Sequence, residues 1–228
     1  MELYISSYKL GNKTDYIKNW IKEHNCNSIL LITNARDTYV QDENEKKRIL
    51  EDVHMLEDCG FNVEILNLRK YFGNAKALEE KVKKYIAFCV IGGNVFALRK
   101  AMELSGFDNF LIKNKNSNML YIGYSAGSCV LSSNLNGLEL VVPSVNPYNS
   151  DYVNYGGLGF ISKTIVPHYK SKHKSSKQID SVIECLEKNH LSYIALQDGD
   201  VIIKDLKEMD ITACNKNYIC ERSNYERN

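Results

Sequence analysis

The sequence predicts an α/β fold, a three-layer α/β/α sandwich with a mostly parallel central sheet. The main observation is that short apolar runs rich in β-forming residues alternate with longer segments of helical periodicity, the βαβα order of a parallel sheet covered on both faces. The chain has 228 residues, 44% of them hydrophobic and 25% charged, which suffices to bury the core of one domain. No repeat, low-complexity segment or linker interrupts it, so we expect a single domain over residues 1–228.

The expected elements follow this alternation. Before Ser125 the strands are expected at 2–6, 28–33, 62–68, 86–91 and 119–123. Helices are expected near 15–24 and 44–59, around Leu78, Val82 and Tyr85, and from Asn94. Within 44–59, the apolar residues recur at helical spacing, which predicts a stripe facing the core: Ile49, Leu50, Val53 and Leu56.

After Ser125 the pattern becomes less regular. Strands are expected at 138–142, 164–166, 193–196, 201–203 and 211–214. One helix is expected to bury a face made of Ile179, Val182, Ile183 and Leu186. The loop 143–162, rich in Asn, Tyr and Gly, is long for a compact domain, and loops of that length are often functional.

The charge balance excludes some classes of function. Lys and Arg number 29 against 28 Asp and Glu, a formal charge of +1, too balanced for a protein that neutralises many nucleic-acid phosphates. No apolar run is long enough to span a bilayer, and no signal peptide is recognisable, so a cytoplasmic protein is expected. The seven cysteines contain no C-x-x-C pair, and free thiols in a reducing compartment are the simplest interpretation.

The sharpest local feature is the run 121–130, in which an apolar strand leads through G-x-S-x-G into residues suited to a helix. This is the pattern of a nucleophile elbow. Gly123 and Gly127 supply positions without a Cβ, where a bulky residue should clash. The following helix directs free N–H groups and its positive dipole end at Ser125, and Ala126 N–H is a candidate oxyanion donor. A serine in an ordinary strand-to-helix turn is the alternative.

A second backbone-amide site is expected one strand earlier. Gly92 and Gly93 follow an apolar strand, and Asn94 is placed to cap the next helix. Open α/β folds bind ligands at the carboxyl ends of their strands. We therefore expect Gly93 N–H to complete an oxyanion hole with Ala126, and Asn94 to lie in the substrate site. The alternative is a glycine pair that serves packing, with Asn94 as a plain cap.

A serine nucleophile requires a base and an orienting carboxylate. Among five histidines, His168 is preferred as base because it follows the apolar strand 164–166, and His173 in a lysine-rich loop is the weaker candidate. The other three are expected to be structural: His24, His54 and His190. Glu139 gives the chain order Ser, acid, His, and it is the preferred acid over its competitors Asp151 and Asp198.

Three ordered motifs carry a family resemblance: G-x-S-A-G at 123–127, Gly92-Gly93-Asn94, and Val166-Pro167-His168-Tyr169. Together they resemble the dipeptidase E (aspartyl dipeptidase) and cyanophycinase family of serine peptidases, over nearly the whole chain. The resemblance implies a flavodoxin-like fold, similar to class I glutamine amidotransferases but with serine replacing their elbow cysteine. It implies Ser125 as nucleophile, His168 as base and an acid after the elbow, best matched by Glu139, with no metal or cofactor.

The resemblance also implies a substrate, a short peptide, cleaved through an acyl-enzyme. Aspartyl dipeptidases hold an N-terminal Asp with arginines after the catalytic histidine, whereas this chain has lysines there, which supply charge without a bidentate fork: Lys170, Lys172, Lys174 and Lys177. We expect Lys177 to contact substrate and Asp198 to hold its α-amino group. A solvated lysine loop is the alternative.

Two other functions stay open at this point. One is a non-catalytic small-ligand binding protein on the same fold. The other is an esterase of α/β-hydrolase type, although that fold usually places its histidine near the chain end. A cysteine amidotransferase is disfavoured because the elbow carries serine, and Cys129, one helical turn on, is expected to pack in the core. We expect a monomer or homodimer with no nucleic-acid or membrane partner.

Overall fold

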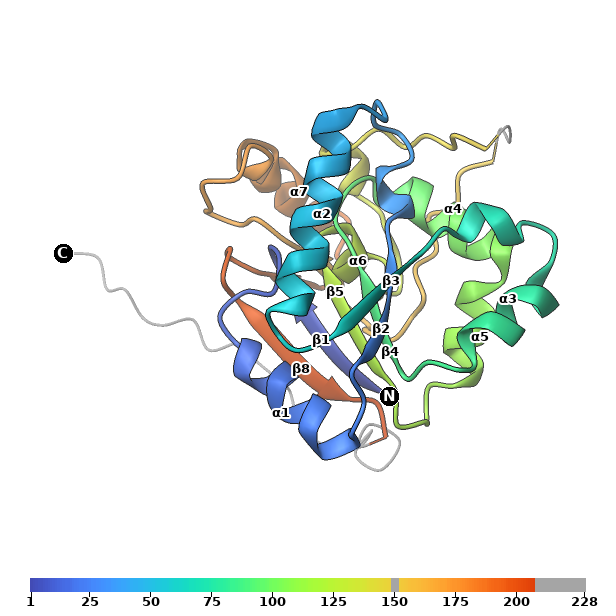
Figure 1. The fold of residues 1–228 in the computed structure, drawn as a ribbon. Coiled ribbons are helices and arrows are strands. Elements are labelled where there is room, and N and C mark those ends of the chain that lie inside the picture. The colour runs from blue at the N-terminus through green and yellow to red at the C-terminus, as the bar shows by residue number, and fades with distance from the viewer. Residues whose placement is uncertain (149–151, 208–228) are drawn as a thin grey trace.

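The computed structural model describes residues 1–148 and 152–207, which form a central sheet with helices on both faces (Figure 1). The strand order is β3-β2-β4-β5-β1-β8. All neighbouring pairs are parallel except β1 and β8, which are antiparallel. The strands are β1 (Glu2–Ser6), β2 (Ser28–Ile32), β3 (Asn62–Leu66), β4 (Ala87–Val90), β5 (Leu120–Tyr124) and β8 (Val201–Asp205). The expected mostly parallel sheet is confirmed.

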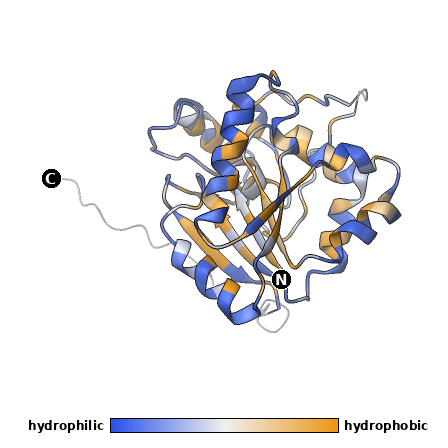
Figure 2. Cartoon of the chain, viewed as in Figure 1, coloured by the Kyte–Doolittle hydropathy of each residue, from blue (hydrophilic) through white to orange (hydrophobic). Residues whose placement is uncertain are grey.

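The sheet separates two hydrophobic cores because successive strand residues point to opposite faces. In β2, Leu30 and Ile32 belong to one core, and Ile29 and Leu31 to the other. Figure 2 shows the apolar strands in the interior, beneath helices with hydrophilic outer faces. The second core is closed by α1 (Thr14–His24) and α2 (Glu43–Glu57), and the first by α3 (Ala75–Val82), α4 (Val95–Ser105) and α5 (Phe107–Lys113). The three-layer architecture is confirmed.

A second, two-stranded sheet lies beyond the main one. It pairs β6 (Thr164–Val166) with β7 (Tyr193–Ala195) in parallel, and α7 (Ser176–Lys188) connects them. The inner face of α7 buries Ile179, Val182 and Leu186 at spacings of three and four, as the periodicity predicts. The pairing matters for the site because parallel strands end at the same edge.

The segment 138–142 is not a strand. Gly137 adopts a φ of 86°, and the chain continues as the short 3₁₀ helix η3 (Leu138–Leu140). Only Leu138 of this helix is buried. The apolar segment that predicted a strand therefore anchors a turn through this one side chain. The expected segment 211–214 lies outside the described residues.

The inner face of α2 is also different from expectation. Leu50, expected in the apolar stripe, is 52% exposed, whereas Glu45 and Asp52 are buried beside Leu56. This helix therefore presents carboxylates, and not only apolar groups, toward the interior. No helix in the described part of the chain has the length and hydrophobicity that crossing a bilayer requires.

Candidate functional site

Ser125 occupies a strained turn between β5 and the short helix α6 (Ala126–Cys129). Its φ of 49° and ψ of −114° are rarely adopted by residues with side chains, and such backbone typically costs about 1–3 kcal/mol. A Cβ on Gly127 would lie 2.0 Å from the carbonyl oxygen of Val90, and one on Gly123 would lie 2.5 Å from that of Gly127. The two glycines of the motif are therefore required by contact with adjacent backbone.

The end of β4 lies beside this turn. Gly93 has a φ of 150°, and a Cβ there would lie 2.3 Å from the carbonyl oxygen of Ala35. Asn94 N–H donates to that same oxygen at 2.7 Å, which fixes the loop. Within the described chain, the N–H groups of Gly93 and Ala126 donate no hydrogen bond to protein, and both residues line the same cleft as Ser125.

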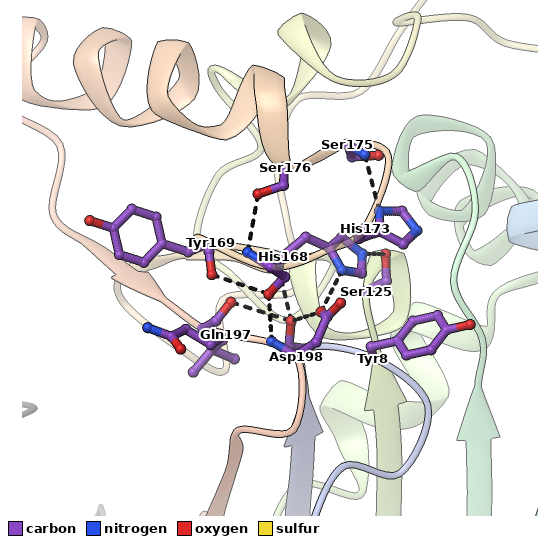
Figure 3. Close-up of polar contacts among 12 residues, drawn as sticks. Tyr8, Ser125, His168, Tyr169, His173, Ser175, Ser176, Gln197 and Asp198 are labelled. Atoms are coloured by element: carbon purple, nitrogen blue, oxygen red, sulfur yellow. Dashed lines mark hydrogen bonds and ion pairs between the residues drawn. The ribbon is translucent and has the colours of Figure 1, made fainter.

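His168 lies between a serine and a carboxylate. Its Nε2 is 3.1 Å from Ser125 Oγ, and its Nδ1 is 2.7 Å from Asp198 Oδ1. Figure 3 shows the imidazole with Ser125 on one side and Asp198 on the other. The structure thus brings together the predicted serine and the predicted histidine, and joins them to a carboxylate that competed with the preferred one.

The small sheet explains why histidine and aspartate meet. Val166 at the end of β6 is paired with Ala195 at the end of β7. The ladder continues past both strands, because Leu196 N–H donates to Val166 and Tyr169 N–H donates to Leu196, each at 2.9 Å. The residues that follow the two strands, among them His168 and Asp198, consequently emerge at one edge.

Ser7 links this edge to the main sheet. Its hydroxyl donates to Asp198 Oδ1 at 2.9 Å and accepts the backbone N–H of His168 at 2.9 Å. Ser7 is fully buried and directly follows β1. Ser7 is not among the site residues predicted from the sequence, although its position directly after a strand that neighbours β5 is a signal that could have identified it.

The environment of His168 favours its neutral form. Burial lowers the pKa of His168 below its ordinary value of 6.5, and the hydrogen bond and charge of Asp198 oppose this shift without cancelling it. The His168 side chain is 4% exposed and that of Asp198 25%. A neutral ring that donates from Nδ1 to the carboxylate has a free electron pair at Nε2, so it can accept the proton of Ser125.

Glu139 does not reach the imidazole. It lies exposed on η3, and it makes no hydrogen bond or ion pair in the described structure. The preference for Glu139 as the acid is therefore corrected, because the carboxylate on His168 Nδ1 is that of Asp198. For the same reason Asp198 is engaged by His168 and Ser7, which conflicts with its expected role as a contact of a substrate amino group. Asp151 lies outside the described residues.

The other two expected substrate contacts, Asn94 and Lys177, lie in different environments, one buried and one exposed. Asn94 is buried, with its side-chain oxygen accepting the N–H groups of Phe96 and Ala97 and its amide donating to Pro143 at 2.8 Å. It acts as the helix cap of α4. Lys177 is exposed in the first turn of α7 and is absent from the cleft wall, whereas Lys172 and Lys174 line it.

The cleft at Ser125 has a volume of about 610 Å³. Three of its basic groups are already paired: Lys9 Nζ lies 2.5 Å from Asp52, and Arg36 and Arg48 contact Glu45 at 2.6 and 3.7 Å. Three lining groups form no ion pair within the described residues, namely Lys172, Lys174 and Glu51. These groups are available to a charged ligand.

Cys129 also lines the cleft, but its thiol is not available as a nucleophile. Burial raises the pKa of its thiol to about 12, so it stays protonated. It packs in the core, as expected. Among residues 1–148 and 152–207, no cluster of three or more His, Cys, Asp or Glu side chains could hold a metal ion.

Comparison with known proteins identifies relatives. The profile of peptidase family S51 matches residues 4–212. An uncharacterized peptidase of Listeria monocytogenes is 28% identical over 116 residues, covering 51% of this chain and 55% of its own. Peptidase E of Streptomyces coelicolor is 29% identical over 121 residues, covering 50% and 46%. This chain spans about half the length of the curated relatives it matches.

The fold also has solved counterparts. The crystal structure of a peptidase from an acI-B1 actinobacterium superposes with a TM-score of 0.65 at 19% identity, covering 89% of this chain and 82% of that one. At this identity the comparison concerns the fold alone. It agrees with the flavodoxin-like architecture described above.

Proposed function

The chain belongs to peptidase family S51, and on that premise we propose that it is a serine peptidase that hydrolyses short peptides through an acyl-enzyme. One observation carries the proposal: Ser125, His168 and Asp198 are hydrogen-bonded in series at the wall of a cleft. Their distances of 3.1 and 2.7 Å are those at which a proton can be transferred and an imidazole held in one tautomer.

In the first step, His168 Nε2 takes the proton of Ser125 while Oγ forms a bond to the scissile carbonyl carbon. Asp198 accepts the hydrogen bond of Nδ1–H throughout and stabilises the imidazolium that results, without itself being protonated. The carbonyl oxygen becomes an oxyanion, for which we assign the free N–H groups of Gly93 and Ala126. The strained turn supports this assignment because it holds Ser125 at the cleft while its neighbours stay buried.

In the second half of the reaction, His168 gives its proton to the leaving amine as the C–N bond breaks. Water then transfers a proton to His168 and attacks the ester carbon, and the returning proton releases Ser125 with a free carboxylic acid as product. This sequence restores every group to its starting protonation state. It requires no oxidant, reductant or cofactor.

The cleft supports a short, charged substrate. Lys172 and Lys174 are suited to a carboxylate, either the side chain of an N-terminal Asp or the terminal carboxylate of a dipeptide, and Glu51 is suited to an amino group. A volume of about 610 Å³ holds a small peptide and no folded protein. The five described cysteines are free thiols, which supports a reducing compartment such as the cytoplasm.

The deciding experiment combines a covalent probe with a peptide panel. A fluorophosphonate should label Ser125 of the purified protein, and dipeptides with Asp, Ala, Lys or isoaspartyl at the first position should be cleaved to different extents. Ser125→Ala should abolish labelling and turnover, whereas Ser133→Ala, an exposed serine outside the cleft wall, should retain both.

Each outcome discriminates between functions. Labelling with cleavage confined to peptides supports the peptidase, and turnover of simple esters without peptides would favour an esterase instead. Absence of labelling in a folded protein would reject the proposal in favour of a ligand-binding protein.

A further inference from the structure

The ring of His173 lies directly on the ring of His168. The two centroids are 3.7 Å apart and the planes differ by 13°. Figure 3 shows His173 over His168, with Tyr8 close to both. The Tyr8 ring lies 6.1 Å from that of His168, at an interplanar angle of 62°, and 5.8 Å from that of His173. His168 is thus enclosed by two aromatic rings as well as by its hydrogen-bond partners.

We infer that His173 is a positioning residue that covers one face of the base and must be uncharged for His168 to take the proton of Ser125. This inference rests on the function proposed above. The reaction turns His168 into an imidazolium, and an aromatic ring stacked at 3.7 Å stabilises a cation only while it carries no positive charge itself. A protonated His173 would instead repel the charge that develops beneath it.

A hydrogen bond supports the uncharged form of His173. The backbone N–H of Ser175 donates to His173 Nδ1 at 3.2 Å, so Nδ1 holds a lone pair and the neutral ring carries its proton on Nε2. Protonation at Nδ1 would replace this contact with two N–H groups facing each other. The loop backbone therefore selects the tautomer that the inference requires.

The groups around His173 act in opposite directions. Burial is the main factor that lowers the pKa of His173, followed by repulsion from His168, while Asp198 raises it and Lys174 lowers it further. Lys172 of the same loop and Lys9 of the segment after β1 also line the cleft, as does Tyr8, which contributes a neutral phenol. The helix α2 side of the cleft adds Arg48, Glu51 and Asp52, and Arg36 lies beside them. Because His168 and His173 repel each other when charged, protonation of one ring opposes protonation of the other.

The pH dependence of turnover tests this role. Below the titration range of both rings, log kcat/KM of the native protein should fall with a slope approaching two per pH unit, since two protons disable the site. His173→Phe keeps a flat ring but cannot be charged, so its slope should fall to one while kcat at neutral pH stays close to the native value. His173→Ala should also give a slope of one, with kcat lowered about tenfold because the base is less well held. KM should change little in either variant.

A matched control and a second measurement complete the test. His24 is stacked on Trp20 at 4.2 Å and does not line the cleft, so His24→Phe should leave the profile unchanged. In Ser125→Ala protein, NMR titration of the imidazoles reports on the coupling without any turnover. The His168 resonance should show two coupled steps with His173 present and one step in His173→Phe.

The outcomes separate this inference from the proposed function. If no peptide is cleaved but the NMR coupling is present, the peptidase proposal fails and the histidine pair stands. If turnover is found with a slope of one in the native protein, or if His168 titrates identically in His173→Phe and native protein, the inference is rejected.

Discussion

Ser7 Oγ and Asp198 Oδ1 lie 2.9 Å apart, and that same carboxylate oxygen accepts from His168 at 2.7 Å. The buried hydroxyl also accepts the backbone N–H of His168. One serine after β1 therefore holds both the histidine and its acid, and among the described residues it makes no hydrogen bond to Ser125.

Removing this hydroxyl should loosen the histidine and aspartate together. Ser7→Ala leaves a buried N–H without its acceptor, and we expect a loss of about 1–3 kcal/mol in the free energy of unfolding. kcat should fall at least tenfold, since the base is displaced. Urea denaturation and peptide kinetics measure the two effects. Ser105→Ala, which removes another buried and doubly bonded hydroxyl, should lower stability with kcat unchanged; equal kinetic losses in both would contradict the assignment.

The acid can be identified by exchanging carboxylates for amides. Asp198→Asn should lower kcat by about 10³ to 10⁴-fold, because the amide cannot hold the Nδ1–H tautomer or stabilise an imidazolium. Glu139→Gln should stay close to native kcat, since Glu139 is exposed and makes no contact with His168. Steady-state kinetics on the best peptide measure kcat of both variants. A larger loss of kcat in Glu139→Gln than in Asp198→Asn would identify Glu139 as the acid instead.

The turn around Ser125 should tolerate no added atom at Gly127. The Cβ of Gly127→Ala would lie 2.0 Å from Val90 O, so we expect a loss of more than about 3 kcal/mol or failure to fold. Gly73→Ala meets no atom within 4 Å and should lose only about 1–2 kcal/mol from its positive φ. Thermal denaturation measures the stability of the two variants. Similar losses of stability would show that the backbone around Gly127 and Val90 can move apart to admit the added methyl group.

The lysines on the cleft wall should determine how well acidic peptides bind. Replacing Lys172 and Lys174 by Met should raise KM for Asp-containing dipeptides about tenfold, the loss of one charge-assisted contact, while kcat stays similar. Lys177→Met, outside the cleft wall, is the matched control. An equal effect in the control, or none in the double variant, would remove the lysines from the substrate site.

Acidification should destabilise the protein through its two stacked histidines. Burial lowers the pKa of both His168 and His173 below 6.5, the ordinary value they have in the unfolded chain. As pH falls below about 6.5, the unfolded state binds protons that the folded state resists, so stability decreases with falling pH. Urea denaturation across this range should show a smaller decrease in His173→Phe than in native protein. A decrease of the same size would mean that other groups are responsible.

The periodic part of the fold could be predicted from sequence because its signals are local. Strands β1, β2, β4 and β5 are short, mostly apolar runs, and the helices between the strands repeat apolar residues at three and four positions. The sequence pattern gave wrong predictions where tertiary contacts determine the secondary structure or the buried face of a helix. The apolar residues of 138–142 predict a strand, but Gly137 turns the chain into a 3₁₀ helix. Leu50 is exposed, whereas Asp52 on the same helix is buried and bonds to Lys9 and Tyr124.

The site, like the fold, could be predicted only where the signal lies in neighbouring residues of the sequence. Ser125 and His168 carry motifs that can be recognised within a few residues, and the structure places their side chains at hydrogen-bonding distance. Asp198 becomes the partner of His168 only because β6 and β7 pair in parallel, which no local pattern specifies. Ser7 depends on contacts between segments far apart in the chain, which a single sequence does not reveal. The stacking of His173 on His168 is local, but it depends on a loop conformation that no sequence pattern specifies.

The distance along the chain between Ser7 and Asp198, 191 positions, has a consequence for biosynthesis. A ribosome delivers Ser125 and His168 well before Asp198, and β1 lacks one of its two sheet neighbours until β8 follows. Contacts of such long range form late in folding. A nascent or truncated chain that stops before residue 198 therefore lacks the carboxylate that accepts from both His168 and Ser7, so the proposed site is completed only by the last part of the fold.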